Sequence, residues 1–172
     1  HEGCPNRLFV KGSLSDGTCF VTEGEKDALT VYGLYDGTVA AVSAEYGATS
    51  GESGNKWKPE YNSQLTGMDV YILCDNDGAG RNFADIEASE LIKTANAVYL
   101  LDIAKVWPEC PEKGDITDMV AALGKDKARA MLDEQVGKAS AFHLPEETGD
   151  DGDDYFDKFL ATITSDAFKP YE

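Results

Sequence analysis

Residues 68–81 read MDVYILCDNDGAGR. The first seven, Met68 to Cys74, are mostly apolar or aromatic and predict a buried strand. Two carboxylates, Asp75 and Asp77, follow that strand directly, and two glycines open the segment after them. Ligands of open α/β sheets bind at the carboxyl ends of the parallel strands. The order of residues therefore predicts a polar site between this strand and the next helix.

Strand-like and helix-like segments alternate along most of the chain. This alternation is typical of βαβ units, which build a parallel sheet covered by helices. We therefore predict a Rossmann-like α/β domain with a central, mainly parallel sheet flanked by helices. The expected strands are 19–22, 38–43, 68–74 and 97–102, and the expected helices are 27–34, 80–94, 116–123 and 125–136.

The composition fits one medium-sized globular domain with appendages. The chain has 172 residues, 42% of them hydrophobic, and no apolar run near the roughly 18 residues that a membrane helix needs. We expect a soluble, cytoplasmic protein.

No two of its four cysteines have the C-x₂₋₄-C spacing of a structural zinc site. Cys19 and Cys74 lie in apolar runs and are expected to be buried, reduced thiols.

The net charge of −17 argues against broad wrapping of nucleic acid by this chain alone, because such binding depends on lysine and arginine contacts to phosphates. The remaining acidic excess, outside the acidic segment 145–172, is either a solvated surface or a group of carboxylates that holds a cation.

We expect residues 1–18 to lead in from an upstream domain of a longer protein. Residues 19–140 would form the main domain, and residues 141–172 an acidic linker with a short helix.

A loop rich in glycine, serine and threonine separates two of the predicted strands, between Ala44 and Pro59. It is longer than an ordinary connection and could serve as a lid or a contact surface. Lys56 and Lys58 in this loop are candidate phosphate contacts.

Two further acidic clusters accompany Asp75 and Asp77. Glu23 follows the predicted strand 19–22 directly, and Asp27 stands one helical turn later. Taken alone, Glu23 could be a helix-start carboxylate and Asp27 a surface residue. The third cluster, residues 112–118, reads EKGDITD. Its Asp115 is also the natural N-cap of the helix predicted over 116–123.

A lone D-x-D pair is most often a capped turn, but two strand-end acidic motifs together favour a divalent cation. Asp75 and Asp77 would then bind Mg²⁺ or Mn²⁺. Glu23 could bind the metal or accept a proton, and its residue type does not separate the two roles. Arg81 and Lys113 are candidate phosphate contacts, although such residues are also common as solvated surface charges.

Three motifs in this order resemble the Toprim domain shared by DnaG-type primases, topoisomerases and some nucleases. They are E-G-x-x-D at 23–27, D-x-D-x-x-G-R at 75–81 and K-G-D-x-x-D at 113–118. The resemblance covers about residues 20–123, and it is closer to primases of phages, plasmids and mobile elements. It implies a metal-binding centre of Glu23, Asp75 and Asp77, supported by Asp27 and Asp115. Asp118 departs from the D-x-D spacing of many cellular primases.

The resemblance implies the Toprim catalytic domain of a DNA primase, a nucleotidyltransferase that makes primers for DNA replication. Its partners would be a single-stranded DNA template and nucleoside triphosphates. An upstream zinc ribbon with a basic region, and a P-loop helicase domain downstream of Glu172, are expected in the parent chain. Without the basic region we expect the 172 residues alone to be inactive in primer synthesis.

Several alternative functions compete with this interpretation. A Toprim nuclease or topoisomerase could cleave phosphodiesters with the same carboxylates, and a haloacid-dehalogenase-like phosphatase could use Asp75 as nucleophile. A calcium-binding EF-hand is excluded, because its fifth and twelfth positions would be Ala79 and Ile86. A docking module for basic partners is the non-enzymatic alternative.

Overall fold

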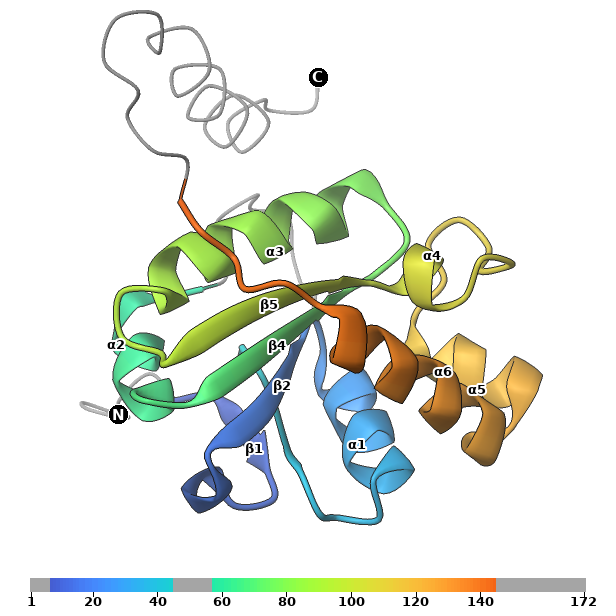
Figure 1. The fold of residues 1–172 in the computed structure, drawn as a ribbon, viewed down its shortest axis with the longest axis horizontal. Helices are drawn as coiled ribbons and strands as arrows, with labels where there is room; N and C mark the ends of the chain where they lie inside the picture. The colour runs from blue at the N-terminus through green and yellow to red at the C-terminus, as the bar shows by residue number, and fades with distance from the viewer. Residues whose placement is uncertain (1–6, 45–56, 145–172) are drawn as a thin grey trace, which may run out of the picture.

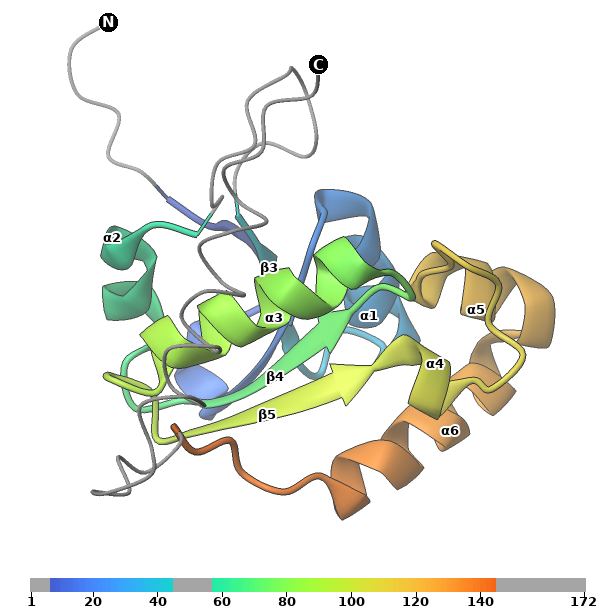
Figure 2. The ribbon, with the colours of Figure 1, turned by 90° about the horizontal axis from the view of Figure 1, so that it is seen from above.

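The computed structural model describes residues 7–44 and 57–144 of the chain. In these residues, five strands form one sheet in the order β1-β3-β2-β4-β5, with helices on both faces (Figures 1 and 2). Four neighbouring strands are parallel, and the edge strand β1 (Phe9–Lys11) runs antiparallel to β3. The parallel strands are β2 (Thr18–Thr22), β3 (Ala40–Ser43), β4 (Asp69–Cys74) and β5 (Ala97–Asp102). The predicted α/β class is confirmed.

The longer helices lie where the sequence predicted them, within three residues at each end. They are α1 (Glu25–Leu34), α3 (Gly78–Leu91), α5 (Ile116–Leu123) and α6 (Lys125–Lys138). Two single-turn helices, α2 (Pro59–Asn62) and α4 (Ile103–Val106), were not predicted. Short 3₁₀ turns cover Leu14–Asp16 and Ser63–Leu65. β1 was also not predicted, although it lies in the segment 1–18 that we expected to lead in from another domain.

Each face of the sheet has its own apolar core, because successive side chains of a strand point to opposite faces. On one face Val21 and Val70 pack with residues of α3, among them Ala84, Ala88 and Leu91. On the other face Phe20 and Leu101 pack with residues of α1, α5 and α6. The parallel strands are therefore held between two helical layers.

The chain reverses its direction across the sheet between β2 and β4. From β2 it passes through α1 to β3 on one side, whereas β4 pairs with the other side of β2. α1 and α3 cover opposite faces (Figure 1). This is a topological switch point, where the two loops diverge and leave a crevice at the carboxyl ends of the strands. The residues that follow β2 and β4 lie at that crevice.

The described cysteines agree with a reduced protein. Cys19, Cys74 and Cys110 are free and buried. Burial raises the pKa of Cys19 and of Cys74 to about 12, so both thiols stay protonated at neutral pH. The prediction of buried thiols at these two positions is confirmed. Among the described residues, no helix is both long and apolar enough to cross a membrane.

Candidate functional site

The loops after β2 and β4 meet at the switch point. Thr22 and Leu73 are paired in register near the ends of these strands. One residue after Thr22, Glu23 accepts a hydrogen bond at its Oε1 from the backbone N–H of Asp75, over 3.4 Å. The structure thus brings together the first two predicted acidic motifs. We call the carboxylates at this end of the sheet the acidic edge: Glu23, Asp27, Asp75, Asp77 and Asp115.

Gly80 allows the first turn of α3 to approach Glu23 closely. A Cβ atom at this position would lie 2.3 Å from Glu23 Oε1, and 3.0 and 3.1 Å from the backbone O and N of Asp75. Contacts this short cannot form without movement of the neighbours. Glycine is therefore required here for close approach rather than for an unusual φ angle.

Asp77 has the helix-capping role that its position allows. It is the N-cap of α3, and its Oδ1 accepts a 2.7 Å hydrogen bond from the backbone N–H of Gly80. Capping by a carboxylate is favourable because it satisfies a free N–H at the positive end of the helix. The cap uses Oδ1, and the described part of the chain shows no hydrogen bond to Oδ2.

Asp75 is a strongly perturbed carboxyl of the acidic edge. Its pKa is raised to about 8, first by burial and then by the negative charges of Glu23, Asp27, Asp115 and Asp77. Each neighbour disfavours the ionised form of Asp75. A cation bound here would relieve that repulsion. Strongly perturbed carboxyls of this kind are more frequent at functional sites than elsewhere.

Asp27 connects the acidic edge to α5. It is only 6% exposed, and its Oδ1 accepts a 2.7 Å hydrogen bond from the Thr117 hydroxyl. Burial raises the pKa of Asp27, and the bond from Thr117 partly opposes this rise. Asp27 is thus a buried polar residue of the α1–α5 contact.

Asp115 has the N-cap role that the sequence left open. Its Oδ1 accepts from the backbone N–H of Asp118, whose side chain in turn accepts from the backbone N–H of Asp115, forming a capping box. Its Oδ2 accepts a 2.6 Å hydrogen bond from the Lys26 ammonium, which also lies 3.9 Å from Asp27. A cationic side chain therefore already neutralises part of the acidic edge.

The predicted phosphate contacts are placed differently from one another. Arg81 lies at the start of α3, where its guanidinium pairs with Asp102 at 2.9 Å. Lys113 is exposed and has a φ of 63°, in the left-handed region; within the described residues it forms no ion pair. Lys58 directly precedes α2. Asn62, the last residue of α2, donates a hydrogen bond to Glu90 O, so α2 lies at the end of α3 opposite to Asp77 (Figure 1). Lys56 lies outside the described residues.

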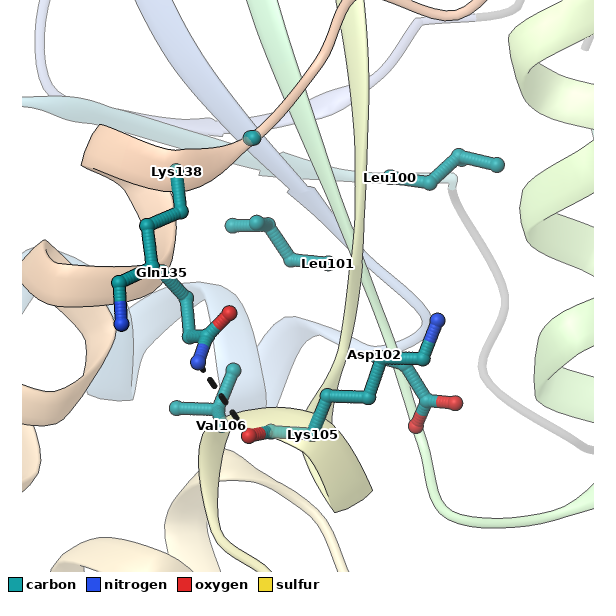
Figure 3. A pocket seen from close by; sticks show the side chains of 8 residues that line it. Leu100, Leu101, Asp102, Lys105, Val106, Gln135 and Lys138 are labelled. Carbon is teal, nitrogen blue, oxygen red and sulfur yellow. Dashed lines mark hydrogen bonds between the residues drawn. The ribbon is translucent and has the colours of Figure 1, made fainter.

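The described residues contain two small hollows near this end of the sheet. One, of about 60 Å³, lies between β5, α4 and α6 and is lined by residues such as Leu101, Lys105 and Gln135 (Figure 3). The other, of about 10 Å³, is lined by Glu23, Ala44, Phe83 and Glu87. Ligand pockets usually measure at least about 300 Å³, so neither hollow would enclose a nucleotide.

The chemistry of the acidic edge suits a hard cation. Within residues 7–44 and 57–144, no three histidine, cysteine, aspartate or glutamate side chains form a ready-made metal site. Mg²⁺ binds through one or two carboxylates and retains several waters, so it does not need a closed protein cage. Glu23, whose carboxylate lies beside the Asp75 backbone, together with the Asp75 and Asp77 carboxylates could supply oxygen ligands to such an ion.

The sequence did not reveal several residues that shape this site. They are Lys26, Asn76, Asp102 and Thr117, which bond to or between the predicted residues. Of these residues, only Asn76 could have been suspected from the sequence, since it stands between two predicted ligands. The other three belong to segments whose contacts become known only with the tertiary structure.

Comparisons with known proteins support the fold. Neither the protein-family models nor the curated proteins gave a match. Among solved structures, the chain is similar to the crystal structure of the Aquifex aeolicus primase, comprising its zinc-binding and RNA polymerase domains. The two share 20% sequence identity with a TM-score of 0.53, over 87% of this chain. The matched region is 34% of that primase chain, so this chain spans about a third of its length.

Proposed function

We propose that this chain carries the Toprim-type catalytic domain of a DNA primase, which transfers nucleotides to make primers. The observation that carries the proposal is the meeting of Glu23 and Asp75 at the switch point of a parallel sheet. Ligands of such sheets bind at that position. The similarity in fold to a bacterial primase is consistent with the proposal, as are the three acidic motifs in their order.

Asp75 and Asp77, with Glu23, would hold Mg²⁺ or Mn²⁺, since their oxygens are the ligands that these ions prefer. When bound, the metal would neutralise phosphate charge and lower the pKa of the attacking 3′-hydroxyl. Asp75 is suited to this role because burial, and then the negative charges of its neighbours, raise its pKa to about 8. Binding of a cation would favour its ionised form.

The remaining residues of the acidic edge would position the substrate or support the ligands. Glu23 stands beside the backbone of Asp75 and would either bind the metal or accept the hydroxyl proton. Asp27 and Asp115 would act from the second layer, because Thr117 and Lys26 already bond to them. Lys113, which is exposed and stands two residues before Asp115, would contact a phosphate.

The template and the nucleoside triphosphate would be held largely by other parts of the protein. The chain has 15 basic and 32 acidic residues, whereas binding a polyanion requires basic surface. We propose that an upstream zinc ribbon with a basic region supplies this surface and that a P-loop helicase domain follows the chain. The phage or mobile-element origin is part of the same proposal.

A Mn²⁺ titration tests the metal centre directly. Free Mn²⁺ would be followed by electron paramagnetic resonance in the 172-residue chain and in Asp75→Asn/Asp77→Asn. We expect the double variant to bind at least about tenfold more weakly, because two charged ligands are removed. Asp69→Asn is the matched control, since Asp69 begins the same strand at its opposite end. Equal binding by the parent and the double variant would refute the assignment.

An activity assay then separates primase from the related chemistries. The full parent protein and its Glu23→Gln variant would be given template, nucleoside triphosphates and Mg²⁺, with Glu25→Gln as the exposed neighbouring control. Primer synthesis lost only in Glu23→Gln supports the proposal. Phosphodiester cleavage without synthesis would favour a nuclease or topoisomerase, and a covalent phosphate on Asp75 would favour the phosphatase.

A further inference from the structure

Asn76 lies between the two predicted metal ligands, and its side chain bonds away from them. Its Nδ2 donates hydrogen bonds of 3.0 Å to the backbone carbonyls of both Cys110 and Pro111. Its Oδ1 accepts a 2.8 Å hydrogen bond from Arg81 Nη2. An asparagine that only shapes its own turn bonds to backbone two or three residues away. Here the two acceptors are 34 and 35 residues away in sequence.

The backbone of Asn76 binds the same distant segment. Its N–H donates to Gly114 O over 3.0 Å, and its carbonyl accepts from Lys113 N–H over 2.9 Å. Together with the side chain, four hydrogen bonds join Asn76 to residues 110–114. That segment leads directly into Asp115. Asn76 therefore links the loop that carries Asp75 and Asp77 to the segment that carries Lys113 and Asp115.

The segment 110–114 is compact and held in an unfavourable conformation. A Cβ on Gly114 would lie 2.6 Å from Cys110 Sγ and 2.9 Å from Pro111 O, so the backbone is folded tightly on itself. Lys113 has a φ of 63°, a region that non-glycine residues seldom adopt. Such a conformation persists only when surrounding contacts hold it, and strained residues cluster at functional sites. The bonds to Asn76 flank Lys113 and supply such contacts.

Arg81 extends this arrangement to the next strand. It donates to Asn76 Oδ1 and also pairs through Nε with Asp102, the last residue of β5. The loop after β4, the start of α3, the end of β5 and the segment 110–114 are thereby connected through two side chains. An arginine with its guanidinium shared in this way supports neighbouring groups through fixed geometry.

We propose that Asn76 is a positioning residue. It fixes the segment that carries Lys113 and Asp115 against Asp75, so that this segment and Asp75 act on the same ligand. The proposal rests on the proposed function, because the ligand is the metal-bound phosphate group of that reaction. Asn76 itself would contact neither metal nor substrate. The chemistry requires this because a metal centre assembled from separate segments loses affinity when those segments move independently.

The test measures local opening and metal binding in the 172-residue chain with Asn76→Ala and Asn76→Asp. Asn76→Ala removes all the side-chain bonds, whereas Asn76→Asp keeps an acceptor for Arg81 and loses both donors. Asn82→Ala is the control, a change of the same kind at a half-buried position of α3, six residues after Asn76. Hydrogen exchange would be read at the amides of Asn76 and Lys113, and Mn²⁺ affinity by electron paramagnetic resonance.

We expect exchange at these amides to be at least about tenfold faster in both Asn76 variants, since Asn76→Asp loses two side-chain hydrogen bonds and Asn76→Ala loses three. Exchange in β2 and β4 and the melting temperature should stay close to the parent. Mn²⁺ should bind Asn76→Ala about three- to tenfold more weakly, because a ligand segment is no longer held in place. Asn82→Ala should match the parent in every measurement.

Hydrogen exchange and Mn²⁺ affinity together distinguish a failure of the Asn76 proposal from a failure of the proposed function. Unchanged exchange in both variants would overturn the proposal, because Asn76 would then not hold the segment. Faster exchange with unaltered Mn²⁺ affinity would also overturn it, because the bonds would be structural only. A parent chain that binds no Mn²⁺ would refute the proposed function, and the exchange result would still decide whether Asn76 fixes the segment.

Discussion

Replacing Gly80 by alanine should disturb the acidic edge selectively, and Gly78 provides a matched control. Both glycines lie in the first turn of α3. A Cβ on Gly78 would meet no atom within 4 Å, whereas a Cβ on Gly80 would lie 2.3 Å from Glu23 Oε1. The two substitutions add the same methyl group to the same helix. Any difference between them therefore reports the contacts of Gly80.

The magnitude follows from these distances. Alanine is favoured over glycine in a helix by up to about 1 kcal/mol, so Gly78→Ala should raise the free energy of unfolding by about 0.5 kcal/mol in this first turn. In Gly80→Ala the Glu23 carboxylate must move about 1 Å to restore ordinary contact, which breaks its bond to Asp75 N–H at a cost of about 1 kcal/mol. The Asp75 backbone must also shift by a few tenths of an ångström, and such overpacking costs about 1 to 3 kcal/mol.

Gly80→Ala should thus be about 1 to 3 kcal/mol less stable than the parent, after the helix gain is subtracted. Urea unfolding of the parent and both variants measures this difference. Mn²⁺ titration of the same three proteins should show weaker binding only in Gly80→Ala, because Glu23 is displaced there. If Gly80→Ala matched Gly78→Ala in both stability and Mn²⁺ affinity, the close approach of α3 to Glu23 would play no part in the site.

Three further predictions follow from the same carboxylates. Glu23→Gln should leave thermal unfolding nearly unchanged, since an amide oxygen can still accept from Asp75 N–H and a repulsive charge is lost; a large fall in melting temperature would show that Glu23 is structural. Mn²⁺ affinity should rise up to about tenfold per pH unit from pH 6 to about 8 and then level off, because the metal must displace a proton from Asp75, whose pKa is about 8. A pH-independent affinity would exclude Asp75 as a ligand. Lys26→Met should tighten Mn²⁺ binding a few-fold by removing the ammonium beside Asp115. The free energy of unfolding in urea should change by only about 1 kcal/mol, because the Lys26 side chain is largely exposed although Asp115 is buried. Weaker Mn²⁺ binding would instead mean that Lys26 holds the ligands in place.

The same raised pKa has a consequence for the metal-free fold. Between the unfolded value for an aspartate, about 4, and the folded value of about 8, the folded state binds the proton more strongly. Stability should therefore fall as pH rises through this range and be regained when a cation binds. The expected sign is the reverse of that for a carboxylate in a salt bridge. At neutral pH the metal-free domain is thus expected to have a lower free energy of unfolding than it has at about pH 4.

The sequence predicted the long elements well because their patterns are local. β5 and α5 were predicted at their observed bounds, 97–102 and 116–123. The missed elements are only three or four residues long, too short to show a period of their own. β1 exists because it pairs with β3, and α4 because Asp102 caps it. β1 therefore depends on a neighbour that the tertiary structure provides, whereas the cap of α4 is local and the helix was missed because one turn shows no period.

The same distinction holds for the site. The meeting of Glu23 and Asp75 could be predicted, since the ends of adjacent parallel strands lie at one edge of a sheet. The pairing of Arg81 with Asp102 could not, because the sequence suggested Arg81 only as a phosphate contact and gave no partner for Asp102. Lys26 likewise bonds to a residue 89 positions away. Long-range polar contacts leave no periodic trace in a sequence.

The residues at the start of α3 show that helix capping and packing alone do not explain the acidic edge. Helix capping needs only Asp77, which already accepts from Gly80 N–H. Packing of α3 on the sheet is provided by Ala84, Ala88 and Leu91. Neither task needs Glu23 beside Asp75, where each charge disfavours the other. A neutral side chain at position 23 would avoid that repulsion, although a Cβ at position 80 would still lie 3.0 and 3.1 Å from the backbone O and N of Asp75. A cation at the acidic edge, as proposed, would offset this repulsion, and Gly80 lets the start of α3 lie close to both Glu23 and the Asp75 backbone.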